Sequence, residues 1–450
     1  MLAFGILLPL AAGWLIAGRL LPNQGRIIRA AVAFGLAVGV TSVEFFFTLL
    51  IVGKSSRIVS LAAAVLMLIV SWRFRAKRST TTAVISKRSI WLWPTGAFAV
   101  WMVLSAGIEL LMGLASAPHG EYDGVAIWNT RARGLYRGGP NWRDAFHPSR
   151  YHTDYPLLLP TTVARLWTWQ GFETPLAGGL FGVACLAGIV ALVGAGVSRL
   201  RGPELGCLAV GFLLANPWFV GHAYWQYADI PLSLYITGAV VVWVLGRNGP
   251  GGFGPPTVVG LFLGFGAWTK NEGLAFAGVF LVLAIVEAIR HRNRRQDWLA
   301  LAAGFAIAFA AIVAFKLAVR AENDLVEGQN RDTIAKLTDP GRWQAVMSYA
   351  WSYFIDQPWY HLLVLPAAIL GLGFGRLPKG MGVPTLAVTG TASIYLFVYI
   401  TTPHNLDWHL ATSFDRLVTH LMPAVYFLSF AMLLPIGQAS FATKAIASTR

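Results

Sequence analysis

Acidic and basic side chains that could do chemistry stand together in one short segment, APHGEYDGVAIWNTRARGLYRGG, at residues 117–139. Glu121 and Asp123 come first, and Arg131, Arg133 and Arg137 follow. A carboxylate can take the proton of an attacking hydroxyl group, and an arginine can hold an anion such as a phosphate. The segment therefore combines groups for acid–base chemistry with groups for anion binding.

Further polar residues recur in three later places. They are Asp154 and Tyr155 in the same loop, Tyr227 and Asp229 in YWQYADIPLSLY (224–235), and Lys270 and Glu272 in GFGAWTKNEGLAF (264–276). Each also has a purely structural explanation. Asp123 and Asp229 could simply cap the helices that they precede. Lys270 could extend its amine to the membrane border, or could pair with Glu272.

A last group crowds the segment TPHNLDWHLATSFDRLVTH at residues 402–420. Its members are His404, Asp407, His409, Asp415, Arg416 and His420. Two histidines and an acid could hold a metal ion, but their spacing matches no specific metal signature, so we expect no metal and no other cofactor. Arg416 either forms an ion pair with its neighbour Asp415 or binds a phosphate.

The composition indicates that these residues are held by membrane-spanning helices. The chain has 450 residues, of which 56% are apolar and 12% charged, and its mean hydropathy is +0.60. Soluble chains carry about 25% charged residues, so this is an all-α polytopic membrane protein. Its net charge of +15 comes from basic clusters between apolar segments, which membrane lipids and topology explain, and nucleic acid is not expected as a partner.

A membrane-spanning helix needs about 20 mostly apolar residues. The sequence predicts thirteen, near 2–21, 29–52, 57–72, 91–115, 174–197, 204–220, 229–246, 256–270, 272–290, 297–319, 358–375, 381–401 and 416–437. We divide the chain into N-terminal helices (1–90), a central module (91–290) with a long loop at 116–173, and C-terminal helices (291–450) with a second long loop at 320–357.

The short basic loops predict the orientation of these helices. Residues 73–88 and 290–295 are rich in lysine and arginine, which places both on the cytoplasmic side. These two loops lie on the same side of the membrane only if residues 154–170 form an interfacial helix that does not cross the membrane. Most acids then lie outside, whereas Glu204, Glu287 and Asp297 lie at cytoplasmic ends. Glu44 and Glu109 fall inside spans, where an acid is costly and therefore a functional candidate.

The loop at 116–173 should contain a helix that lies flat on the membrane surface. Apolar residues recur there with helical spacing, namely Val125, Trp128, Ala132, Leu135 and Tyr136. Polar residues are expected on the other faces, namely Asn129, Arg131, Arg133 and Arg137. Asp123 stands at the start of this helix.

The order of these motifs resembles the GT-C glycosyltransferases. The shared features are an acid after an early span, an amphipathic surface helix, a Tyr-Pro helix, the Asp-x-Pro motif at Asp229 and the Thr-Lys pair at 269–270. The resemblance covers roughly residues 90–290 and points to the branch with protein mannosyltransferases and lipid A aminoarabinose transferases.

That resemblance implies a GT-C fold and a specific reaction. A sugar would pass from a polyprenyl-phosphate donor to a glycan, lipid or protein acceptor, at the outer face of a bacterial inner membrane. Asp123, with Glu121 as its rival, would be the general base, and Lys270, Arg416 and Arg131 would bind the donor phosphate. The implied substrate-binding residues are Asp154, Tyr155, Asp229, Tyr227, Glu272, His404, Asp407 and His409.

The chain also departs from this family. Four predicted spans precede the loop where the family usually has one, and Tyr155 stands where the aminoarabinose branch has a lysine that faces the donor phosphate. Other functions remain open: a ligase that transfers a whole lipid-linked glycan, a lipid-linked-sugar flippase or transporter, and a non-catalytic assembly factor. Secondary transporters usually contain repeated halves, and this sequence shows no internal repeat, which argues against transport.

Overall fold

The computed structural model describes residues 2–73, 90–147, 149–150, 152–250, 252–291, 295–320, 323, 329, 332–356 and 373–436. Over these residues the chain is helical, and its only β-type pairing is one bridge between Phe374 and Leu433. The N-terminal and central helices are α1 (Leu2–Leu20), α2 (Arg26–Val52), α3 (Arg57–Arg73), α4 (Leu92–Ser116), η1 (Gly124–Asn129), α5 (Thr130–Arg137), η2 (Gly139–Phe146), α6 (Leu158–Gln170), α7 (Leu176–Arg201), α8 (Pro203–Leu214), α9 (Pro217–Tyr224), α10 (Asp229–Arg247), α11 (Gly254–Ala267) and α12 (Asn271–Arg290). The C-terminal helices are α13 (Arg295–Val319), α15 (Asp332–Thr338), α16 (Pro340–Asp356), α18 (Gly382–Thr401) and α19 (Leu406–Met432).

Eight of the described helices are long and apolar enough to cross a membrane, namely α1, α2, α4, α7, α10, α12, α13 and α18. The helices α8 and α9 together form a ninth candidate, bent by 70° at the break between them. The chain is therefore an all-α polytopic membrane protein. Of the other predicted spans, α3 and α11 are shorter apolar helices, α19 is a long helix outside this set, and 358–375 lies almost wholly outside the described residues.

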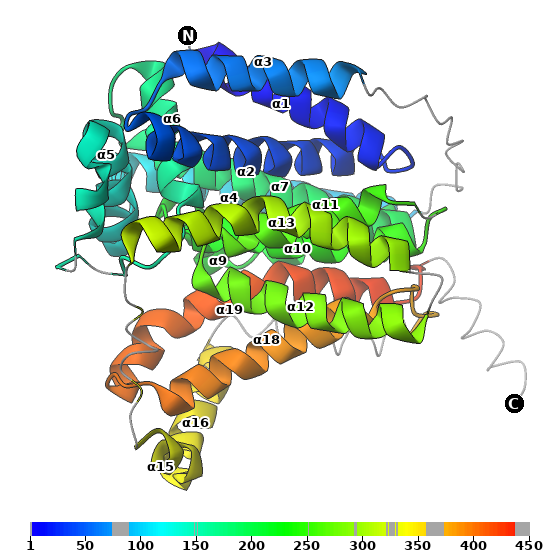
Figure 1. Cartoon of the computed structure of the whole chain (residues 1–450). Coiled ribbons are helices and arrows are strands. Elements are labelled where there is room, and N and C mark those ends of the chain that lie inside the picture. The colour runs from blue at the N-terminus through cyan, green and yellow to red at the C-terminus, as the bar shows by residue number, and fades with distance from the viewer. Residues whose placement is uncertain are drawn as a thin grey trace, which may run out of the picture.

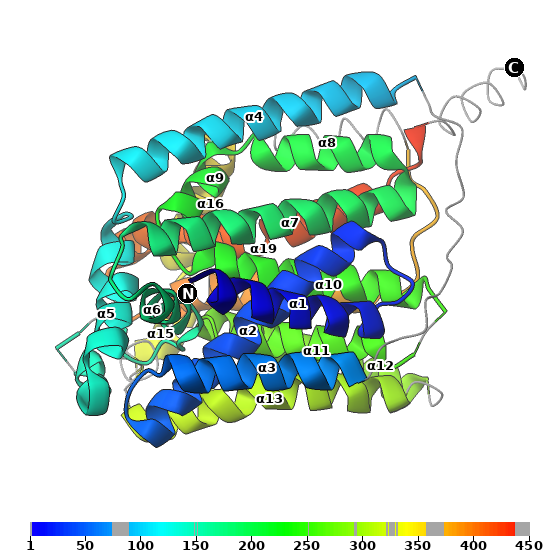
Figure 2. The same ribbon diagram turned by 90° about the horizontal axis from the view of Figure 1, so that it is seen from above.

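The helices run roughly side by side around α10, which is almost entirely buried (Figure 1). The helix α10 packs against α7, α11 and α19. Seen from above, α4 and α8 lie along one side of the bundle and α3 and α13 along the opposite side (Figure 2). The short helices α5 and α6 sit at one end of the bundle in both views, and we call this the site end.

Charged residues at the two ends of α10 form separate groups of ion pairs. Asp229 is the first residue of α10 and Arg247 is the last, so the two are about 27 Å apart along the helix. At the far end, Arg247 pairs with Glu287 at 3.0 Å and also with Asp297. The sequence placed these two acids on the opposite side from Asp229, and the structure confirms that separation.

Close packing of α2 against α11 depends on glycine. A Cβ atom on Gly39 would lie 2.3 Å from the ring of Phe265, and one on Gly35 would lie 2.7 Å from the ring of Phe262. Both phenylalanines are fully buried, so neither ring can easily move aside. Glycine therefore lets two large aromatic rings lie directly on the backbone of α2.

We expect Gly39→Ala to lower the thermal unfolding midpoint of the purified protein, because overpacking a core costs about 1–3 kcal/mol. Gly96→Ala on α4 is the matched control, since nothing lies within 4 Å of a Cβ atom at that position. An unchanged midpoint for Gly39→Ala would contradict the tight α2–α11 contact.

The surface helix in the loop forms, but its polar face differs from the prediction. Trp128, Ala132 and Leu135 are buried in the protein, whereas Val125, predicted on the same face, is 41% exposed, and Asn129 and Arg131 are buried as well. Arg131 lies three residues after Trp128 and four before Leu135, and Asn129 lies three before Ala132, so both polar residues share the helix face of these apolar ones. The prediction that Asn129 and Arg131 lie on other helix faces than these apolar residues was therefore wrong.

Candidate active site

A buried carboxylate, Asp229, forms the centre of the site. Its Oδ1 accepts hydrogen bonds from Lys270 Nζ at 2.9 Å and from His420 Nε2 at 2.6 Å. Its Oδ2 accepts one from Arg416 Nε at 3.2 Å. The N-cap of α10 is Ala228, and Asp229 makes no capping hydrogen bond, so the capping explanation for Asp229 was wrong.

Arg416 connects Asp229 to a second carboxylate. Its Nη1 donates to Oδ2 of Asp123 at 2.6 Å, so one guanidinium bridges two acids from different parts of the chain. Asp123 occupies the N-cap position of η1 but makes no side-chain capping bond, so capping does not explain it either. The side chain of Asp123 is 17% exposed and that of Asp229 is 0% exposed. Of the two acids that Arg416 joins, Asp123 is thus the one that a substrate can reach.

Lys270 is held between two acids and does not extend to the surface. It is 2% exposed, and its Nζ lies 3.1 Å from Glu272 Oε1 in addition to its bond with Asp229. Of the explanations open from the sequence, surface extension was wrong and pairing with Glu272 is confirmed. Lys270, Arg416, Asp229, Asp123 and Glu272 therefore form one connected group, which we call the charge network.

Aromatic rings border the charge network on two sides. The ring of Tyr155 stacks between His152 and Trp128, with centroid distances of 4.8 and 5.7 Å, and Lys270 Nζ lies 5.7 Å from its centre. Arg416 Cζ lies 4.9 Å from the centre of the Tyr227 ring. Burial and the charge of Asp123 raise the pKa of Tyr227 to about 12, so its hydroxyl stays protonated at neutral pH and can donate a hydrogen bond. Such rings suit the apolar faces of sugars.

Asp154 belongs to a neighbouring cluster. Its Oδ2 accepts hydrogen bonds from the side-chain amides of Asn271 and Asn323, and its backbone oxygen accepts one from Lys316. Arg131 lies on this side too, because it donates to the backbone oxygen of His152 and is attracted by Asp154. Burial lowers the pKa of Arg131 to about 10, which leaves it charged at neutral pH. Asn271, which follows Lys270, connects the two clusters.

No family model, curated protein or solved structure matches the chain.

Three residues predicted for substrate binding lie apart from the charge network, at the start of α19. His409 contacts Thr402 and the ring of Tyr399, His404 packs against Trp408, and Asp407 is exposed. His409 and Arg416 are seven residues apart, about 10 Å along the helix. Within the described residues, no group of three metal-binding side chains could hold a metal ion.

The structure also reveals partners that the prediction left out. His420 binds Asp229, and Asp415 lies 3.6 Å from the buried His222, so the predicted pairing of Arg416 with Asp415 was wrong. Spacing could have identified His420, because residues 409, 416 and 420 share one face of a helix. Asn271, Lys316 and Asn323 had no comparable signal, since their role depends on how distant segments pack.

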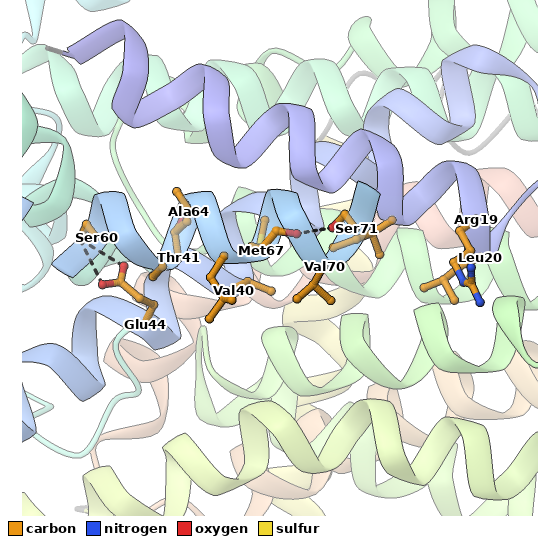
Figure 3. Close-up of a pocket in the computed structure, with 13 residues that line it drawn as sticks. Arg19, Leu20, Val40, Thr41, Glu44, Ser60, Ala64, Met67, Val70 and Ser71 are labelled. Carbon is orange, nitrogen blue, oxygen red and sulfur yellow. Dashed lines mark hydrogen bonds between the residues drawn. The ribbon is translucent and has the colours of Figure 1, made fainter. Parts of the chain in front are cut away.

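The other candidates lie outside the network. Glu121 is exposed, and its hydrogen bonds are made by its backbone, whose N–H donates to the carbonyl of Trp225 at 3.1 Å and whose carbonyl accepts from Val125 at 3.0 Å. Glu44 accepts hydrogen bonds from Thr48 and Ser60 and lines a cavity of about 550 Å³ between α1, α2 and α3 (Figure 3). Glu109 lines a groove between α4 and the α8–α9 break. Neither of the last two contributes to the charge network.

Proposed function

We propose that this protein is a membrane glycosyltransferase. It would move a sugar from a polyprenyl-phosphate donor to an envelope lipid, glycan or protein acceptor, as the resemblance to GT-C enzymes implies. The observation that carries this proposal is the bridge made by Arg416, which joins a partly exposed acid to a buried acid that also holds Lys270. A base and two cations thus meet at one end of an apolar helix bundle.

The proposed reaction assigns a separate task to each group. Asp123 takes the proton of the acceptor hydroxyl as its oxygen attacks the anomeric carbon of the sugar. The bond from that carbon to the phosphate oxygen breaks, and its electron pair leaves with the polyprenyl phosphate. Lys270 and Arg416 stabilise the charge that the phosphate gains. Asp229 positions both cations and does not take part in proton transfer.

The position of the network supports a lipid donor over a nucleotide donor. The charge network lies at the site end with the short helices α5 and α6 (Figures 1 and 2), which the sequence predicts to lie at the membrane interface, where a lipid phosphate would sit. The opposite end carries basic residues such as Arg201, Arg247 and Arg290, which fits a cytoplasmic side under the positive-inside rule. The site end would then face the exterior, where nucleotide sugars are absent. A transporter would instead hold its substrate near the middle of the membrane.

A donor assay tests this proposal. Purified full-length protein is incubated with a panel of polyprenyl-phosphate hexoses and pentoses, and released polyprenyl phosphate is measured by mass spectrometry. We expect release from at least one lipid donor and none from nucleotide sugars without a lipid carrier. Transfer from a nucleotide sugar in the absence of lipid carrier would overturn the proposal.

A further inference from the structure

A second cavity lies between α1, α2, α6 and α7, and none of its lining residues belongs to the charge network. Its volume of about 400 Å³ is in the range of small-molecule binding sites. Polar groups line it where α6 and the start of α7 pass, namely Thr162, Arg165, Gln170 and Thr174. The remaining wall is almost wholly apolar, with Pro9, Leu10, Phe34, Val38 and Phe181 among its residues.

Arg165 is the one cationic side chain that lines this cavity. It is 6% exposed, and its Nε and Nη2 atoms are buried without a hydrogen-bond partner. Burial lowers its pKa to about 10, so the guanidinium is still charged at neutral pH. A buried charge whose N–H groups are unsatisfied is costly, which indicates that a partner is missing.

The nearest acid does not satisfy Arg165. Glu44 attracts Arg165, but its carboxylate points toward Ser60 of α3. The hydroxyl oxygen of Ser60 lies 3.1 and 3.2 Å from the two carboxylate oxygens (Figure 3). Thr48 donates a further bond to the same carboxylate at 3.0 Å. Glu44 and the ring of Trp169, whose centre lies 5.9 Å from Arg165 Cζ, thus offset part of the charge, but neither accepts a hydrogen bond from Nε or Nη2.

The shape of the cavity suits a lipid. Its wall on α7 extends from Leu176 to Ala184, about 12 Å along the helix. This length leaves room for a hydrocarbon segment beside α7. Ile6, Leu176 and Leu180 are 38%, 40% and 57% exposed, so the rim opens between α1 and α7 onto the apolar outer surface of the bundle. A tail could enter sideways from the bilayer while its head group stays at the site end.

We propose that this cavity binds a lipid phosphate, with its oxygens on Arg165 and its aliphatic chain against α1, α2 and α7. Membrane glycerophospholipids and polyprenyl phosphates share this chemistry. The inference does not rest on the proposed glycosyl transfer, because it uses none of the residues of the charge network.

Native mass spectrometry of the delipidated full-length protein tests this site. Dioleoylphosphatidylglycerol, undecaprenyl phosphate and uncharged dioleoylglycerol are titrated separately. We expect at least one of the two phosphate lipids to bind more tightly than dioleoylglycerol. Arg165→Gln should weaken that binding about tenfold, the loss expected for charge-assisted hydrogen bonds. Arg137→Gln removes an exposed arginine at the same end and should leave binding unchanged.

A second pair of variants keeps the test valid if Arg165→Gln fails to fold. Ala184→Phe fills the apolar part of the cavity, whereas Ala187→Phe, one turn further along α7, adds the same ring on the exposed face. Only Ala184→Phe should weaken binding. If the variants weaken the binding of only one of the two phosphate lipids, that lipid is the ligand of the cavity. Equal binding of dioleoylglycerol, or unchanged binding in both Arg165→Gln and Ala184→Phe, would overturn the proposal.

Discussion

Asp123→Asn is expected to lower the rate of sugar transfer by roughly 10²–10⁴, because asparagine cannot accept the proton of the acceptor hydroxyl. The amide oxygen of asparagine can still accept the hydrogen bond from Arg416, so the arginine should keep its place. The ion pair that is lost is partly exposed, with side chains 15% and 17% accessible, so stability should fall by only about 1 kcal/mol. The assay is initial-rate transfer at saturating donor, with thermal unfolding of the same preparation.

Glu121→Gln is the matched control for Asp123→Asn. Glu121 lies two residues earlier, and its exposed side chain is outside the charge network. We therefore expect near-wild-type transfer from this variant. Full activity in a well-folded Asp123→Asn protein, or a large loss confined to Glu121→Gln, would show that Asp123 is not the base.

Lys270→Met should reduce transfer by about 10²–10³, because it removes one of the two cations that stabilise the departing phosphate. It also leaves Asp229 and Glu272 with less positive charge in a buried place. Breaking a buried ion pair costs about 3–5 kcal/mol, so the single variant should unfold at a lower temperature as well. Initial rates and unfolding midpoints are measured together.

The double variant Asp229→Asn/Lys270→Met separates catalysis from stability. Removing both charges restores the balance of the buried network, so the unfolding midpoint should recover substantially while activity stays low. Recovery of activity together with stability would mean that Lys270 serves only to neutralise Asp229. Lys270→Arg keeps the positive charge and should retain more activity than Lys270→Met.

The sequence predicted which end of the bundle these charged residues share better than it predicted their partners. Asp229 and Lys270 stand at the ends of apolar segments, and once the topology is assigned both fall at the same end of the bundle. The contact between Asp123 and Arg416 joins residues 293 positions apart. Such a pairing depends on how α19 packs against the loop, and no local pattern encodes it.

Local periodicity succeeded and failed within one short helix. It identified the buried face made by Trp128, Ala132 and Leu135, because these residues follow helical spacing. It misplaced Arg131, which lies three residues after Trp128 and four before Leu135 and therefore shares their buried face despite its charge. The partners of Asp154 were also missed, since two of them are asparagines from separate segments.

A donor phosphate is proposed to bind between Lys270 and Arg416. A cryo-electron microscopy structure of the full-length protein with undecaprenyl phosphate tests it. We predict phosphate density within hydrogen-bond distance of Lys270 and Arg416, with the lipid tail passing between helices at the site end. Phosphate density found only elsewhere, beside Arg165 or at the opposite end near Arg247, would contradict the assignment of the charge network as the donor site.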